Sequence, residues 1–469
     1  MKKVLAVAVA GLVGLWIVGV LFFGRAATIT VDEQIDELNR DLADRAIPVS
    51  VAKQSYESGF LTSASRLLVT VDPAGKEPVR FGVDLDIHHG PFMLWPSGPK
   101  LGAYYIGFTP DLAAVLSERE KAQKILSGFA DRDPLTGGVL IDFAGGKTLD
   151  LKLAPFELVA DDGAVVLENG IVGTFSSDDQ YSTLTGSVEF GALFVEDESE
   201  AGTLDIGPST LTVDITEMYA GNMLTGELSY TLGAVAVNVD GAEHRIDNVS
   251  MYGFSGKNDS GVHGSVDVVA NAISSTDESF TSIFDGPLSA RLDIDYEGLE
   301  ERALRRYADI NQRINQKFYS ALLQGDEASG LDGLSEEDMQ AYVLSMVGLI
   351  KQGFKFDYGI SVAQGDANTG FSLSLDWVDS KALIHKKTLR QVLSGVQANL
   401  KVGIDKVFLS GNEGMMKMPV GLGYAVETPS GIESEATFNR GELRLNGQVI
   451  PYAKKLGSAL DKELPWRAW

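Results

Sequence analysis

The stretch VRFGVDLDI at residues 79–87 decides the fold class of this chain. Apolar residues alternate there with arginine, glycine and aspartate, and this period of two is typical of a strand with one dry and one wet face. The run LLVTVD at residues 67–72 has the same character, and Pro73-Ala74-Gly75 lies between the two as a turn signal. Together the two runs predict an antiparallel β-hairpin.

Runs of the same kind recur along the chain, separated by Asp-Gly, Asn-Gly and Ser-Gly pairs that favour tight turns. We predict further strands at residues 139–143, 149–153, 186–190, 211–215, 234–239, 264–269, 290–296, 354–362, 370–377, 400–410 and 442–450. Strands and helices do not alternate regularly, which disfavours a doubly wound parallel sheet. The predicted fold class is mainly β (α+β), with an N-terminal transmembrane helix followed by an extended, curved antiparallel sheet or sandwich with inserted helices.

Helical spacing of apolar residues is clearest at residues 31–46, where Val31, Ile35, Leu38 and Leu42 form one stripe. The stripe predicts an amphipathic stalk helix that either packs on the protein's own sheet or mediates self-association. Other helices are predicted at residues 110–128, 299–323, 334–350, 388–400 and 452–464. For the helix over 334–350, Ser335 is the expected N-cap because three acidic residues follow it.

The N-terminus begins with Lys2 and Lys3 and continues as an uninterrupted apolar run from Val4 to Gly24. A helix of that length can cross a hydrocarbon core of roughly 30 Å. The alternative, a cleaved signal peptide, has a shorter apolar centre and small residues before its cleavage site, whereas Arg25 follows this run. Because positive residues stay in the cytoplasm, we expect an inner-membrane anchor with the body of the chain in the periplasm.

Composition limits the partners and the chemistry. The 469 residues include 65 acidic and 39 basic side chains, a net charge of −26, so nucleic acid is not an expected partner. Since there is no cysteine, disulfides and thiolate metal sites are excluded. The predicted division of the chain is residues 1–27 (cytoplasmic stub and anchor), 28–47 (stalk helix), 48–298 (β-rich domain), 299–353 (helical segment) and 354–469 (β-rich part with terminal helix).

No catalytic motif is complete. His88 and His89 are adjacent on a predicted strand, so their side chains point to opposite faces and cannot share a metal ion. The sequence AGGKT at residues 144–148 imitates a phosphate-binding loop, but Ile141 occupies the position of its first glycine, and we expect a hairpin turn instead. The run SGPK at residues 97–100 cannot form the helix that a Ser-x-x-Lys nucleophile needs. We predict no catalytic, cofactor or metal-binding residue.

Two short motifs carry a family resemblance. The stretch YESGFLTS at residues 56–63 and the stretch HGPF at residues 89–92, together with Asn446-Gly447 after a late strand, resemble the YdgA-like family of uncharacterised bacterial envelope proteins. The resemblance implies an inner-membrane protein that faces the periplasm, and it implies no catalytic residues. The candidate structural motif consists of Tyr56, Gly59, Phe60, His89, Gly90, Pro91 and Phe92.

These observations predict a non-enzymatic envelope protein that holds or guides lipid or another apolar ligand on a curved sheet. The alternatives are a structural or self-associating scaffold of the envelope and, less favoured, an envelope hydrolase. Expected partners are the inner membrane through residues 4–24, lipid, and a second copy of the chain. An open apolar groove favours the lipid hypothesis, whereas a face sealed by the helices between residues 299 and 350 favours the scaffold.

Overall fold

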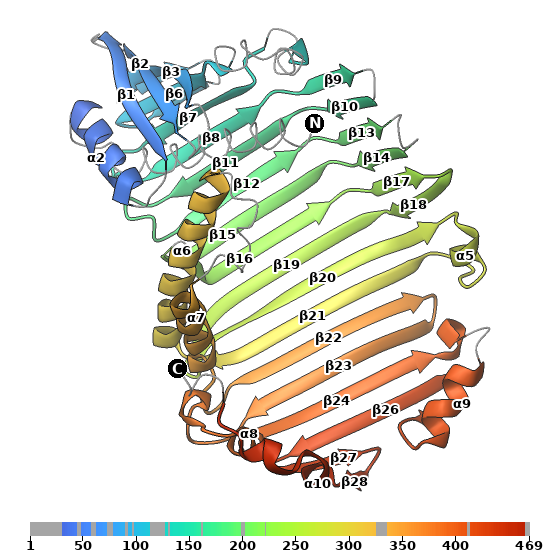
Figure 1. The fold of residues 1–469 in the computed structure, drawn as a ribbon. Helices are drawn as coiled ribbons and strands as arrows, with labels where there is room; N and C mark the ends of the chain where they lie inside the picture. The colour runs from blue at the N-terminus through green and yellow to red at the C-terminus, as the bar shows by residue number, and fades with distance from the viewer. Residues whose placement is uncertain are drawn as a thin grey trace. The chain divides into compact units, whose positions relative to one another are not determined.

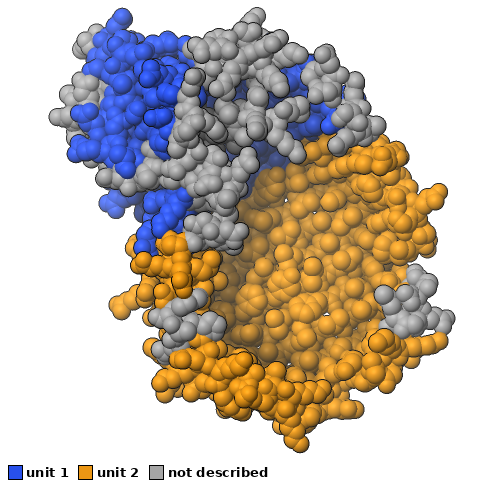
Figure 2. Space-filling view, in the orientation of Figure 1, with its two compact units in different colours: residues 1–199, 208–218, 312–334 blue, residues 200–207, 219–311, 335–469 orange. Residues whose placement is uncertain are grey.

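The chain forms two compact units (Figures 1 and 2). Unit 1 comprises residues 1–199, 208–218 and 312–334, and unit 2 comprises residues 200–207, 219–311 and 335–469. The computed structural model describes residues 31–44, 48–57, 62–72, 78–89, 92–95, 98–112, 127–129, 132–160, 163–197, 202–220, 222–324, 335–409 and 413–464. The five-part division expected from the sequence stays a prediction.

The predicted membrane anchor, residues 4–24, lies outside the described residues. Within the described part of the chain, no helix combines the length and the apolar character needed to cross a membrane. The first described helix is α2 (Val31–Asp44), which corresponds to the predicted stalk.

Unit 1 is built almost entirely of strands (Figure 1). They are β1 (Val49–Glu57), β2 (Thr62–Val71), β3 (Val79–His89), β4 (Phe92–Trp95), β5 (Gly98–Leu101), β6 (Tyr104–Pro110), β7 (Leu135–Ile141), β8 (Lys147–Leu153), β9 (Phe156–Ala160), β10 (Gly163–Leu167), β11 (Ile171–Ser177), β12 (Leu184–Phe190), β13 (Leu193–Asp197) and β15 (Ser209–Tyr219). The main sheet pairs in the order β1-β2-β3-β6-β7-β8-β11-β12-β15, antiparallel throughout. Strands β9, β10 and β13 pair among themselves, as do β4 and β5.

The predicted hairpin is confirmed by the register of β2 and β3, in which Val69 pairs with Phe81. The apolar members of both strands are buried under α2, whose Ile35, Leu38 and Leu42 are at most 5% exposed. The stripe of the predicted stalk therefore packs on the protein's own sheet, which was the first of the two interpretations. This is the largest buried apolar cluster among the described residues.

Unit 2 continues the same architecture with longer strands. They are β14 (Gly202–Ile206), β16 (Asn222–Leu232), β17 (Val235–Val239), β18 (Ala242–Ile246), β19 (Asn248–Asn258), β20 (Gly261–Ser275), β21 (Leu288–Leu299), β22 (Lys355–Gln364), β23 (Ala367–Trp377), β24 (Val396–Asp405), β25 (Val426–Glu427), β26 (Gly431–Asn439), β27 (Glu442–Leu445) and β28 (Gln448–Ile450). The helices are α5 (Glu278–Thr281), α6 (Glu301–Gln324, shared with unit 1), α7 (Glu336–Gly348), α8 (Leu389–Leu393), α9 (Glu413–Gly421) and α10 (Tyr452–Leu456), with the 3-10 turns η2 (Leu383–His385), η3 (Lys406–Leu409) and η4 (Gly457–Asp461).

The main sheet of unit 2 pairs in the order β16-β19-β20-β21-β22-β23-β24-β26-β27-β28, again antiparallel. Strands β14, β17 and β18 pair beside it, and β18 also meets β20. The sheet of neither unit is closed on itself, since β1 in unit 1 and β28 in unit 2 each have one described partner strand. The mainly β, antiparallel prediction is confirmed, and the open sheet replaces the sandwich alternative.

Short breaks bend the strands of unit 1 at matching positions. Strand β8 passes into β9, β10 into β11 and β12 into β13 through gaps of only two or three residues. Across the breaks the backbones stay bonded, with Glu168 N to Ala192 O at 2.8 Å and Gly191 N to Gly170 O at 2.7 Å. Gly170 has a positive φ of 68°, which a residue with a side chain rarely adopts. The breaks are therefore aligned bends in long strands.

The predicted helices over 299–323 and 334–350 are confirmed as α6 and α7, and the Ser335 hydroxyl accepts a hydrogen bond from the Asp338 backbone N–H at 3.1 Å. Most of the predicted helix at 110–128 lies outside the described residues. The prediction over 388–400 is wrong in its second half, where Val396 begins β24 and pairs with Trp377. Pairing with a neighbouring strand outweighs local helix propensity there.

Near the C-terminus the predicted strand over 400–410 ends at Asp405 and gives way to η3. The predicted strand over 442–450 is two short strands, β27 and β28, joined by Asn446 and Gly447 with φ of 47° and 79°. Positive φ at both central residues is the signature of a type I′ hairpin turn, which Asn-Gly favours. The predicted tail helix is split into α10 and η4.

Candidate ligand-binding face

The strands of unit 2 stand in a register that sorts apolar and polar side chains onto opposite faces. Each residue of one strand lies opposite one residue of the next, and paired residues share a face. One apolar row across the sheet is Leu228, Gly253, Val266, Ile294, Tyr358, Leu373, Leu400 and Ala436. A second apolar row is Tyr230, Met251, Val268, Leu292, Ile360, Phe371 and Val402. We call these two rows the apolar face, and they contain no charged residue.

The apolar face is not covered as the core of unit 1 is. Gly253 is buried, Ile360 is 44% exposed, and the other residues of the face are half-buried. In unit 1, by contrast, Val69 and Phe81 have the same alternation and are 2% and 4% exposed because α2 packs on them. The sequence pattern is the same in both places, and the covering element is what differs.

Helix α6 lies beside one end of these strands. The Asn311 side-chain amide donates to the Asn222 side chain at 3.2 Å, and the Arg305 guanidinium lies 4.7 Å from the Tyr219 ring centre. At those strand ends Leu224 and Val262 are fully buried. Figure 1 shows α6 and α7 along this end of the unit 2 strands, and Figure 2 shows a broad hollow in the surface of unit 2 beyond them.

The apolar face is large enough for an extended hydrocarbon chain. Eight paired strands, from β16 to β26, form it. At a strand spacing of about 4.8 Å they span roughly 34 Å. Since one leaflet of a bilayer core is about half of ~30 Å thick, a phospholipid acyl chain fits across this distance. Exposed apolar surface on this scale marks interaction sites more often than plain solvent-facing surface.

The opposite face of the same strands is charged. Arg291 bridges Asp267 at 2.8 Å and Asp293 at 2.6 Å. The side-chain hydrogen bond with Asp293 raises the pKa of Asp267, partial burial adds to the rise, and Arg291 opposes it. All three side chains are at least one-third exposed, so these ion pairs add little to stability. Their charges keep this face hydrated.

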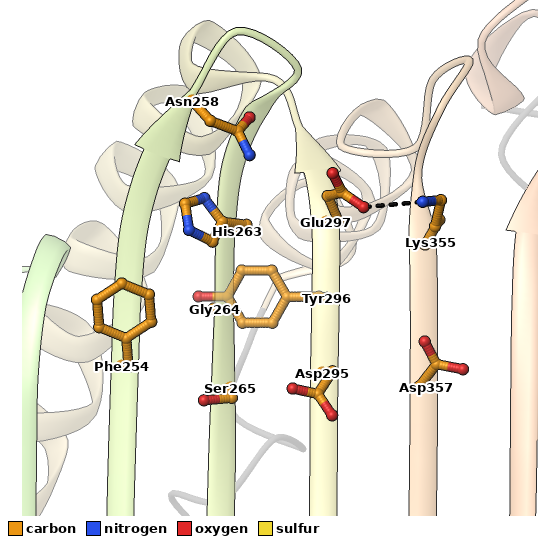
Figure 3. Close-up of a pocket in the computed structure, with 10 residues that line it drawn as sticks. All are labelled: Phe254, Asn258, His263, Gly264, Ser265, Asp295, Tyr296, Glu297, Lys355 and Asp357. Atoms are coloured by element: carbon orange, nitrogen blue, oxygen red, sulfur yellow. Dashed lines mark hydrogen bonds and ion pairs between the residues drawn. The ribbon is translucent and has the colours of Figure 1, made fainter.

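A small pocket of about 370 Å³ opens among β19, β20, β21 and β22 (Figure 3). Lys355 Nζ lies 3.0 Å from Glu297 Oε2, and this hydrogen bond lowers the pKa of Glu297 and raises the pKa of Lys355. The His263 ring packs 5.6 Å from Phe254, and its Nδ1 is buried without a hydrogen-bond partner.

The described residues hold no group of three or more His, Asp or Glu side chains that could ligate a metal ion. His88 and His89 are the last two residues of β3. The His88 ring makes an edge contact with Tyr105 at 6.4 Å.

The described residues of the candidate structural motif belong to unit 1. Tyr56 is 43% exposed near the end of β1 and pairs with Ser65, while Thr62 pairs with His88 near the end of β3. The structure therefore brings the two motif segments, which are about 30 residues apart in sequence, to neighbouring strand ends. His89 ends β3 and Phe92 begins β4, whereas Gly59, Phe60, Gly90 and Pro91 lie outside the described residues.

Among the strands of the apolar face, the predicted strands do not include β16, β19 and β26, which carry Leu228, Tyr230, Met251, Gly253 and Ala436. The signal in NVSMYGFSGKN, residues 248–258, is weak because glycine and serine interrupt the alternation. Its register with β20, in which Met251 pairs with Val268, reveals the face.

Residues 1–453 match a family of bacterial proteins of unknown function, DUF945. The match covers nearly the whole chain, and the protein belongs to this family. No curated protein and no solved structure matches the chain.

Proposed function

We propose that this protein is a non-enzymatic, membrane-anchored envelope protein of the YdgA-like type that holds a lipid acyl chain on its apolar face. The observation that carries the proposal is the uncharged, half-exposed face formed by two rows of side chains across β16 to β26. Apolar surface left in water is unfavourable by about 25 cal/mol per Å², so a hydrocarbon ligand is stabilised there.

The chemistry of the face favours hydrocarbon over a polar ligand. Hydrogen-bonding side chains in its two rows are confined to the hydroxyls of Tyr230 and Tyr358. Charged groups are on the other side of the same strands, as with Asp293 beside Leu292 and Ile294. A ligand on the apolar face therefore meets mainly aliphatic and aromatic carbon, which suits an acyl chain.

The place of action follows from the N-terminus. The apolar run from Val4 to Gly24 is the membrane anchor in this proposal, and Lys2 and Lys3 keep its start in the cytoplasm. The body then stands in the periplasm of the bacterial cell envelope, next to a source of phospholipid. Tethering at a membrane raises the local concentration of lipid around the body.

Photocrosslinking tests this function directly. Full-length protein in mild detergent is mixed with a phosphatidylglycerol whose acyl chain carries a diazirine, irradiated and mapped by peptide mass spectrometry. We expect labels on peptides that contain the apolar face, such as those around Ile360 and Leu373. Labels confined to the charged face, or none at all, would contradict the proposal.

A matched pair of variants sharpens the test. Ile360→Glu places a carboxylate on the apolar face at a position that is already 44% exposed, so the fold tolerates it. Ser372→Glu adds the same charge to the neighbouring strand on the opposite face, where Ser372 pairs with Gly359. Burying a carboxylate under hydrocarbon is strongly unfavourable, so we expect Ile360→Glu to lower crosslinking about tenfold or more. Ser372→Glu is expected to leave it unchanged.

The runner-up is a self-associating scaffold in which a second copy covers the apolar face. It predicts that the full-length protein is a dimer in detergent, that Ile360→Glu makes it monomeric, and that no lipid is crosslinked. Sedimentation velocity on the same samples separates the two functions.

A further inference from the structure

Five large apolar side chains are strongly exposed in unit 2 near the ends of β21, β24 and β26. They come from the segment after α5 and from the segment of α9 and β25, and their exposed fractions lie between 46% and 69%. We call them the apolar rim, which consists of Ile283, Met418, Leu422, Tyr424 and Val426. Single exposed apolar residues are ordinary, but a group of this kind marks an interaction surface.

Backbone hydrogen bonds order the segment that carries Met418, Leu422 and Tyr424. Met418 and Leu422 are four residues apart and share a helix face, with Leu422 N bonded to Met418 O at 3.0 Å. Gly423 then turns the chain with a φ of 76°, and Tyr424 N bonds Pro419 O at 2.8 Å. These bonds fix the exposed side chains on an ordered turn.

Aromatic contacts join the segment around α5 to η3 (Lys406–Leu409), which precedes α9 in the chain. The Phe280 and Phe284 rings lie 5.0 Å apart at α5, and Phe284 lies 5.9 Å from Phe408 of η3. Figure 1 shows α5 and α9 at the same end of the unit 2 strands, opposite the end where α6 and α7 lie. The apolar face thus has helices at one end and the apolar rim at the other.

The apolar face continues along β24 and β26 toward the end of the strands where the rim lies. In β24, Val402 belongs to the apolar face and Ile404 follows it on the same side, paired with Ile432 of β26. In β25, Glu427 pairs with Ile432, whereas Val426 of the rim pairs with Glu433 and so lies on the opposite face. Apolar side chains therefore lead from the middle of the sheet to Ile404 and Ile432, near the ends of β24 and β26.

We propose that the apolar rim inserts into the surface of a lipid bilayer, so that acyl chains pass between the bilayer and the apolar face without crossing water. The occupant is a bilayer because the chain outside the described residues carries the predicted membrane span, which keeps a bilayer within reach of the body. Tyr424 adds the amphipathic ring typical of membrane interfaces. This inference rests on the proposed function for its purpose, although insertion itself is tested separately.

Charged residues of both signs lie beside the rim. Lys406 and Lys417 are exposed beside it, and the exposed Glu427 follows Val426. The whole chain carries a net charge of −26, so attraction to anionic lipid is not the driving force. We expect apolar insertion that occurs on zwitterionic and anionic membranes alike and depends weakly on salt.

The absence of cysteine makes the test direct, because a single introduced cysteine carries the only label. The variants Met418→Cys and Leu422→Cys are labelled with the environment-sensitive dye NBD in the full-length chain. They are reconstituted into vesicles of phosphatidylethanolamine alone or mixed with phosphatidylglycerol. The control is Val449→Cys in β28, which is 55% exposed and pairs with Arg444 on the charged face.

Insertion predicts that NBD at positions 418 and 422 shifts its emission to shorter wavelength and is quenched by spin-labelled acyl chains, while NBD at position 449 stays as in water. Equal emission and quenching at all three positions would overturn the proposal. Insertion seen only with phosphatidylglycerol and lost at high salt would also overturn it, because that is electrostatic adsorption.

The outcomes separate this inference from the proposed function. Quenching at the rim without photocrosslinking of the apolar face leaves the insertion standing and removes the lipid-holding role. If the apolar face is photocrosslinked while NBD at positions 418 and 422 stays in an aqueous environment, the lipid-holding role stands and the insertion is contradicted. A double variant, Met418→Asp with Leu422→Asp, is expected to abolish quenching of a label at Tyr424→Cys while thermal unfolding stays unchanged, since both side chains are already exposed.

Discussion

At Gly191 the backbone of unit 1 is packed too closely for any side chain. A Cβ atom there would lie 1.5 Å from the Glu168 carbonyl oxygen, at the bend between β12 and β13. Gly253 on the apolar face is different, since its Cβ would lie 3.9 Å from the nearest atom, Leu228 O. A side chain at position 191 would therefore clash with the backbone, whereas a methyl group fits at position 253.

This difference predicts unequal effects of the same substitution. Gly191→Ala must push the two strands apart, and we expect it to lower the free energy of unfolding by about 3 kcal/mol or more, in the range of strained core substitutions. Gly253→Ala is expected to change it by less than about 1 kcal/mol. Urea denaturation followed by circular dichroism measures both, and similar losses in the two variants would contradict the bend geometry.

Another residue-scale feature is a buried lysine in unit 2. The Lys386 side chain is 8% exposed, forms an ion pair with Asp379 and lies 5.7 Å from the Trp377 ring centre. The hydrogen bond from Lys386 is the main cause that lowers the pKa of Asp379 below its usual range. An uncompensated buried ammonium is costly, so this carboxylate matters for stability.

The sign of the pH dependence follows from that lowered pKa. A carboxyl whose pKa is depressed on folding stabilises the protein above its unfolded pKa of about 3.9, and that stabilisation is lost as the pH falls through the folded pKa. We expect Asp379→Asn to be less stable than wild type at pH 7, with a difference that shrinks below about pH 4. Denaturation midpoints at the two pH values, with Asp366→Asn as a charge-matched control, measure it. A constant difference would contradict the ion pair.

At the scale of elements, α2 protects the edge of the unit 1 sheet as well as its core. The Asn39 side chain accepts from the Val51 backbone N–H and donates to the Val51 carbonyl, both at 2.7 Å. Strand β1 is the edge of this sheet, and unpaired edge groups invite pairing with other chains. Asn39 occupies those groups at the position where α2 packs on β1.

Loss of this contact has a measurable cost. Asn39→Ala leaves one donor and one acceptor of Val51 without a protein partner, and we expect the free energy of unfolding to fall by about 2 kcal/mol. Asp36→Ala, on the exposed side of the same helix, serves as the control and is expected to change it by less than about 0.5 kcal/mol. Equal stability of the two variants would show that Asn39 does not hold the edge.

At the scale of the whole molecule, the proposals join an anchor, an apolar face and an apolar rim. All three serve the same chemistry, the contact of protein with hydrocarbon, whereas the charged face and the net charge of −26 keep the rest of the body in water. Contact of the rim with the inner membrane from the periplasm requires the proposed topology, which has a separate test.

A fusion reporter provides that test. An enzyme that is active only in the cytoplasm, fused after Trp469 of the full-length chain, is expected to be silent, because the positive residues at the start retain the N-terminus inside. The control is the same fusion on a chain that lacks residues 1–24, which is expected to be active. Activity of the full-length fusion would reverse the topology and place the apolar face in the cytoplasm.

The sequence alone predicted about half of the described strands, because alternation is a local property. Spacing and turn residues predicted the hairpin over residues 67–87 and the hairpin turn at 142–146 between β7 and β8. Spacing and caps predicted helices α6 and α7. Strands β16, β19 and β26, in which glycine and serine interrupt the alternation, were not predicted. The strand predicted over 442–450 ran through the Asn446-Gly447 turn.

Only the tertiary structure decided which alternating strands are covered and which stay open. Val83 with Leu85 and Tyr358 with Ile360 follow the same pattern of spacing, yet the first pair is buried and the second is half-buried or exposed. Burial depends on whether a distant element packs on a face, and α2 does so for the first pair while no helix covers the middle of the second face among the described residues. Local sequence sets the two faces of a strand, and contacts between residues far apart in the chain determine what each face meets.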